Sequence, residues 1–194
     1  MKRKRLTRVL LTVGTTLLLG AAIWALWMQY SVSKNAKRAQ EVVQTLYTLM
    51  PRVTDGAPDD RVNVTMSTIE VDQLRFAGII EIPAYERTLP IYGKWARSKV
   101  KRFPCRYLGS MYDGSLIIGG SDNDGQFDFI KQISNGDRVY VTDTTGVRYS
   151  YTVVNIRRTK DVSTQNICMV DADLIFFAKN SYSMDYTVVY CSLS

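Results

Sequence analysis

The pattern of apolar and polar residues divides the 194-residue chain into three regions. The first is an uncharged run over residues 9–28, which is long enough for a helix to cross about 30 Å of hydrocarbon. Residues 1–8 before it carry five basic side chains, so the positive-inside rule predicts a cytoplasmic tail. The run exceeds the roughly 7–15 residues of a signal-peptide core, and no clear cleavage motif follows. We therefore expect a single-pass membrane anchor rather than a cleaved signal peptide.

The second region, residues 31–50, has the pattern of an amphipathic helix that ends before Pro51. Its apolar residues recur at steps of three or four: Val32, Ala36, Ala39, Val43, Leu46 and Met50. We expect this stripe to pack on the following domain or on a partner, rather than to form a bare stalk. Residues 51–72 show weak periodicity and a turn cluster at residues 54–60, so a surface linker is expected there.

The third region, residues 73–194, consists of short β-rich runs separated by turn residues, which is typical of a barrel or a sandwich. A short helix is predicted over Gln126–Ile133, and a hairpin turn at residues 143–146, with Gly146 near the position that needs positive φ. The predicted strands are Phe76–Ile82, Leu89–Tyr92, Ser115–Gly119, Arg138–Thr142, Val147–Arg157, Asp173–Ala178 and Tyr186–Cys191.

Charge and cysteine content narrow the function classes. The net charge of +7 comes largely from the N-terminal tail, so the rest of the chain has no basic excess of the kind that nucleic-acid binding needs. Without histidine or a Cys-x-x-Cys pair, neither a metal site nor a cofactor is predicted. Residues 122–125 are expected to form a turn rather than a calcium loop. The sequence leaves open whether Cys105 is a core residue or pairs with Cys191.

Five segments occur in an order that resembles the sortase family, the cell-surface cysteine transpeptidases of Gram-positive bacteria. They are Gly78–Pro83, Leu89–Tyr92, Pro104–Ser110, Gly114–Ser121 and Gly136–Asp143. The third of these is similar to a segment of class B-like sortases. The resemblance implies a mainly β domain, an eight-stranded barrel with short helices, carried outside the cell membrane by the N-terminal helix.

The resemblance also implies where the catalytic histidine, cysteine and arginine should stand. In a gapless alignment these positions hold Ser121, Lys179 and Tyr186, and the chain has no histidine at all. A rival alignment makes Cys191 the nucleophile. It would leave the barrel without its last strand and expose an open sheet edge, so the gapless alignment is favoured.

The favoured alignment predicts a catalytically inactive homologue, because a lysine cannot form the thioester intermediate of the family. Such a protein would bind a cell-surface protein or a sorting-signal-like peptide in cell-wall or pilus assembly. The expected groove residues are Ser121, Lys179, Tyr182 and Tyr186. Two enzymatic alternatives remain: a divergent transpeptidase using Cys191, and a hydrolase using a Ser121–Lys179 dyad.

Overall fold

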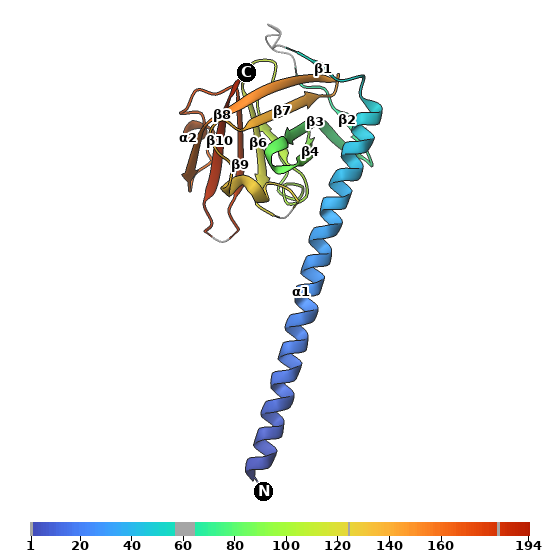
Figure 1. The fold of residues 1–194 in the computed structure, drawn as a ribbon, viewed down its shortest axis with the longest axis vertical. Coiled ribbons are helices and arrows are strands. Elements are labelled where there is room, and N and C mark those ends of the chain that lie inside the picture. The colour runs from blue at the N-terminus through green and yellow to red at the C-terminus, as the bar shows by residue number, and fades with distance from the viewer. Residues whose placement is uncertain (1, 57–64, 124, 182) are drawn as a thin grey trace.

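The computed structural model describes residues 2–56, 65–123, 125–181 and 183–194, and consists of one long helix followed by a β-barrel (Figure 1). Helix α1 (Lys2–Leu49) runs without interruption from the predicted anchor into the predicted amphipathic helix. Within the residues described, no helix combines the length and the apolar character needed to cross a membrane.

Eight strands close into a barrel, which confirms the fold expected from the resemblance. Neighbouring strands follow the order β3–β4–β5–β6–β9–β10–β8, and β7 pairs with both β8 and β3 to complete the ring. The pairs β4–β5 and β6–β9 are parallel, and the other pairs in the ring are antiparallel. The strands are β3 (Leu74–Ile82), β4 (Arg87–Tyr92), β5 (Cys105–Leu108), β6 (Leu116–Ser121), β7 (Arg138–Asp143), β8 (Val147–Thr159), β9 (Leu174–Lys179) and β10 (Tyr186–Leu193).

Two further strands lie inside the segment that was expected to be a linker. Strand β1 (Thr54–Asp55) pairs with the start of β8, and β2 (Ile69–Val71) forms a hairpin with β3. The β2–β3 turn uses Asp72 and Gln73, both at positive φ (50° and 62°). The hairpin lacks the glycine that usually marks such a turn, and its strand is short, so the local pattern did not indicate it.

The short helices also differ from the prediction. The segment expected as a helix over Gln126–Ile133 contains only the 3-10 helix η2 (Asp128–Lys131), whose Phe129 and Ile130 are buried. Two elements were not predicted: the 3-10 helix η1 (Pro83–Tyr85) and helix α2 (Thr164–Ile167). The expected hairpin turn is present, with Gly146 at a φ of +82°.

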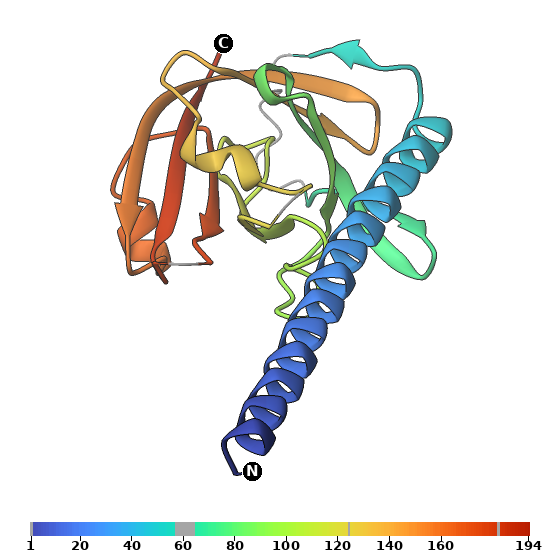
Figure 2. The same ribbon diagram turned by 60° about the horizontal axis from the view of Figure 1, so that its bottom comes forward.

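Apolar side chains pack in three groups. The barrel interior takes the inward apolar residues of every barrel strand except β5, among them Phe176 and Cys191. The predicted stripe of α1 packs on the outside of β3 and β4, where Leu46 is fully buried against a cluster that includes Phe76 and Cys105 (Figure 2). A third group lies on the outer face of β6, β9 and β10, beneath α2: Ile117, Ile167, Ile175, Phe177, Val188 and Tyr190.

Candidate functional site

The three positions singled out by the sequence come together at one rim of the barrel. Ser121 is the last residue of β6, Lys179 is the last of β9, and Tyr186 is the first of β10. Ser121 is the register partner of Lys179 across the parallel pair, and Lys179 is the partner of Tyr186 across the antiparallel pair. Register partners project to the same side of a sheet, so the three side chains share one face. We call Ser121, Lys179 and Tyr186 the rim site; Tyr182 lies outside the described residues.

The face that carries the rim site is the outer face of the sheet, and aromatic rings cover it. Trp95 packs edge-on against Tyr107 at 5.1 Å between centroids, and Tyr107 packs against Phe177 at 5.4 Å. Phe177 in turn contacts Tyr186 of the rim site at 6.0 Å. These four residues, Trp95, Tyr107, Phe177 and Tyr186, form an aromatic wall. Such edge-to-face pairs are favourable beyond the area they bury.

Gly119 on β6 allows the aromatic wall to lie flat against the strand. A Cβ atom at this position would come within 2.5 Å of the Trp95 ring and 2.7 Å of the Phe177 ring. Trp95 and Tyr107 were not predicted as site residues, because one lies in the β4–β5 loop and the other on β5, the one barrel strand missing from the prediction. By contrast Phe176, which is next to Phe177, points into the barrel, and Tyr190 is fully buried beneath α2.

Asp122, immediately after Ser121, links the segment that follows β6 to Ser181, which follows β9. Its carboxylate accepts hydrogen bonds from the Ser181 amide (3.0 Å), the Ser181 hydroxyl and the Lys131 ammonium group (3.0 Å). Burial of this side chain, which is 3% exposed, works to raise the pKa, but the bonds from Ser181 and Lys131 outweigh it and the pKa of Asp122 is lowered. The segment expected to be only a turn therefore holds Ser181, which follows β9, in place.

The rim site places a serine beside a lysine but shows no activated nucleophile. Lys179 is exposed to solvent, whereas a lysine that acts as a base must be desolvated. In the part of the chain that the structure describes, no hydrogen bond joins the Ser121 hydroxyl to the Lys179 ammonium group. The Ser121 amide donates to the side chain of Gln126, and the Lys179 carbonyl accepts from the Asp122 amide at 3.4 Å. The backbone amide of Ser121 and the backbone carbonyl of Lys179 are therefore already hydrogen-bonded within the protein.

The cysteines lie away from the rim site. Cys191 is fully buried on the inward face of β10, and burial raises the pKa of its thiol. Cys105 is also fully buried, in the cluster beneath α1, where burial raises its pKa to about 11 and the thiol donates to the Phe103 carbonyl at 3.4 Å. Cys168 is exposed after α2. All three are free thiols, so the pairing of Cys105 with Cys191 that the sequence left open does not occur.

Comparisons with known proteins agree with this architecture. A model of the sortase domain matches residues 80–188. Among solved structures, Group B Streptococcus Pilus Island 1 sortase C2 superposes with a TM-score of 0.55 at 14% identity, over 83% of this chain and 98% of that one. Sortase A from Corynebacterium diphtheriae gives a TM-score of 0.54 at 13% identity, over 84% of both chains.

A third solved structure, a Clostridium perfringens sortase D5 transpeptidase, gives a TM-score of 0.52 at 14% identity, over 84% of this chain and 99% of that one. No curated protein matches the chain. At these identities the structural matches establish a shared fold and leave the chemistry to be argued from the residues at the rim site.

Proposed function

Because the chain belongs to the sortase family, we propose that it is a catalytically inactive member that binds a cell-surface protein or a sorting-signal-like peptide at the rim site. The observation that carries this proposal is the meeting of Ser121, Lys179 and Tyr186 on one face of three adjacent strands. The positions that the resemblance assigns to the catalytic trio are thus together in space, yet they hold a hydroxyl, an amine and a phenol.

Acyl transfer by a cysteine enzyme needs a thiolate to attack the carbonyl, an acid to protonate the leaving amine and a donor for the oxyanion. The rim site has no thiol, and the chain has no histidine to serve as the acid. Cys191, which is on the same strand as Tyr186, has a raised thiol pKa and faces the barrel interior. These facts support loss of the family reaction.

The aromatic wall supports a binding role. Trp95 is 37% exposed and Tyr186 is half-buried, so their rings are open to a ligand while Phe177 behind them is fixed in the sheet. Rings of this kind suit an extended peptide, which gains contact area by packing its side chains against them. The Asp122 bonds hold Ser181 in place beside the rim site, which lowers the entropy lost on binding.

The proposal includes the location and the subgroup. The uncharged run over residues 9–28 would anchor the chain in the cell membrane with its N-terminus in the cytoplasm. The barrel would then lie on the extracytoplasmic side, where sorting signals are presented. Only the segment Pro104–Ser110 supports placing the chain with the class B-like sortases.

Binding and catalysis are separated by one experiment on the full-length protein in detergent. A fluorescent sorting-signal-like peptide should bind saturably by anisotropy, and intact-mass measurement should show no covalent adduct. Trp95→Ala should weaken binding several-fold. The matched control Tyr140→Ala, on a strand not adjacent to β6, β9 or β10, should not. A covalent adduct, or no saturable binding, would overturn the proposal.

The hydrolase alternative draws on one observation, the direct register of Ser121 with Lys179. If this dyad were active, a fluorophosphonate probe would label Ser121, and Lys179→Ala would abolish the labelling. The transpeptidase alternative would require Cys191 to leave the barrel interior, and peptide mapping after reaction with substrate would then find an acyl group on it. We expect neither modification.

A further inference from the structure

We propose that the β4–β5 loop and the adjoining turn of α1 form a basic face that rests on anionic phospholipid headgroups. The loop, residues 93–103, contains five basic residues and no acidic one. The adjoining turn of α1 adds two exposed lysines. We call Lys34, Lys37, Arg97, Lys99, Lys101 and Arg102 the basic face; Lys94, at the start of the loop, lines a separate cavity with Arg75 and Arg106. This inference rests on the membrane anchor proposed above.

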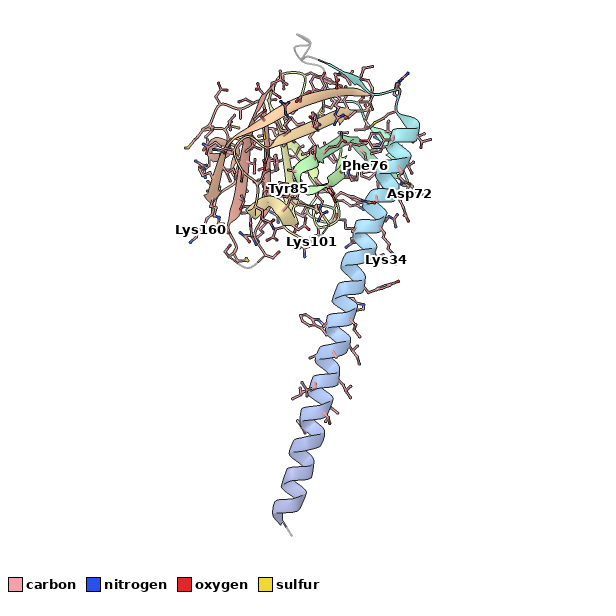
Figure 3. All side chains as sticks on the ribbon, in the orientation of Figure 1. Lys34, Asp72, Phe76, Tyr85, Lys101 and Lys160 are labelled. Carbon is pink, nitrogen blue, oxygen red and sulfur yellow. The ribbon has the colours of Figure 1, made fainter. Side chains whose placement is uncertain are left out.

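The loop is held close to α1, so the two parts of the basic face lie together. Lys101 and Arg102 line a small cavity with Asn35 and Ala36 of the helix. Figure 3 shows Lys34 and Lys101 at the end of the barrel that faces the N-terminus of α1. The loop is also compact, since the amides of Arg102 and Phe103 both donate to the Lys99 carbonyl. The basic side chains are therefore on an ordered element.

The length of α1 sets the height of this face above a membrane. Lys34 follows Met28, the last residue of the uncharged run, by six residues, or about 9 Å of helix. The headgroup layer on each side of a bilayer is roughly 5–8 Å thick. Residues beside Asn35 and Ala36 thus lie at the outer edge of the headgroups, within a Debye length of about 8 Å at physiological salt.

Of the described carboxylates near this face, Glu86 lines a cavity with Lys37 and offsets part of the charge, whereas two others are already paired with basic side chains outside the face. Asp122 is bound to Lys131 at 3.0 Å, and Asp128 is bound to Arg87 at 2.8 Å. By contrast Arg97 and Lys101 are exposed, so their charge faces solvent. Basic residues next to a membrane anchor attract anionic lipids additively. Contact at this face would fix the tilt of the barrel and so the direction in which the rim site faces.

The test uses the full-length protein reconstituted in nanodiscs of phosphatidylcholine alone, or of phosphatidylcholine with an equal amount of phosphatidylglycerol. Peptide mass mapping measures the rate at which Lys101 is acetylated. The protein carries Arg52→Lys, which supplies an exposed reference amine about 22 Å beyond Lys34 along the axis of α1. We expect Lys101 to be acetylated several-fold more slowly in the anionic discs, with no change at position 52. In 0.5 M salt the difference should disappear.

Charge reversal provides matched variants. Arg97→Glu should remove most of the slowing at Lys101, whereas Arg138→Glu, an equal change at an exposed site on β7, should leave it in place. Equal acetylation of Lys101 in neutral and anionic discs would overturn the lipid contact. A chain that alkaline carbonate extracts from the discs would instead overturn the proposed anchor. Loss of peptide binding in either disc would count only against the rim site, so the failures are distinguishable.

Discussion

Strand β10 passes through two contrasting environments within its eight residues. Tyr186 at its start is half-buried beside the exposed Lys179, on the outer face that carries the aromatic wall. Cys191, five positions later, is fully buried in the barrel interior. A nucleophile needs the first environment, because a thiolate forms where water and positive charge reach the sulfur. In this chain the accessible end lacks a thiol, and the thiol lies at the inaccessible end.

This contrast shows why a cysteine at the end of an apolar strand is weak evidence for catalysis. Alternation along β10 sends Tyr186, Val188 and Tyr190 to the outer face, and Val189 and Cys191 to the barrel interior. The face on which a residue emerges depends on the register of the strand. A similar run of letters can therefore end in a catalytic thiolate or in a small apolar core residue.

The largest effect is expected from placing a thiol at the accessible end. In Ser121→His/Lys179→Cys/Tyr186→Arg, the cysteine at position 179 should be alkylated at pH 7 at least ~100-fold faster than Cys191, because it is exposed and faces an imidazole and a guanidinium. Iodoacetamide kinetics with peptide mapping would measure both rates in one sample. Lys179→Cys alone is the control and should be intermediate. Equal rates at the two positions would contradict the comparison.

The buried end is tested by Cys191→Ser. The serine hydroxyl is close in shape to the thiol but needs a hydrogen-bond partner, and none is assured in the barrel interior. We therefore expect a loss of about 1–3 kcal/mol in the free energy of unfolding. Urea denaturation followed by circular dichroism measures this change. Cys168→Ser, at an exposed position, should change stability by less than ~0.5 kcal/mol. A neutral Cys191→Ser variant would mean that this part of the core is open to water.

Loop ordering at the rim is tested by Asp122→Asn, which removes the charge that Lys131 and Ser181 bind. We expect a loss of about 1–2 kcal/mol at pH 7. Because the folded-state pKa of Asp122 is lowered, its contribution is complete above the unfolded pKa of about 3.9 and is lost as pH falls through the folded value.

The pH profile therefore distinguishes the carboxylate from a general packing effect. The stability difference between wild type and Asp122→Asn should shrink as the pH is lowered below about 4, as followed by thermal unfolding. Asp171→Asn, at an exposed position, provides the matched control and should show little difference at any pH. A difference that stays constant down to acid pH would rule out the charge as its origin.

The smallest effect is expected for Lys179→Ala, which removes an exposed side chain from the accessible end. Its free energy of unfolding should change by no more than ~0.5 kcal/mol. Ser121→Ala serves as the paired control on the neighbouring strand. A stability loss above ~2 kcal/mol would show that Lys179 makes an interaction inside the fold, and would weaken its assignment as an open binding position.

The elements that could be predicted from the amino-acid pattern are those whose burial is local and periodic. Seven of the eight barrel strands begin and end within two residues of the predicted limits, because each alternates or is buried along its length. The stripe of α1 is confirmed at Ala39, Val43, Leu46 and Met50, to which the structure adds Val42. The ordered motifs that resemble sortases also pointed to the barrel, because they fall on its strands and turns.

Contacts between distant segments could not be predicted in this way, because they form only when the barrel closes. Strand β5 has only four residues and no strict alternation of buried and exposed positions, so no local pattern identifies it, and it pairs with β4 at a single register position. Trp95 joins the aromatic wall through the close approach that Gly119 permits, and Tyr107 packs against both Trp95 and Phe177. Asp122 gains its role from Ser181, fifty-nine positions away. Local periodicity records which face of an element is buried, whereas these contacts depend on the order of strands around the ring.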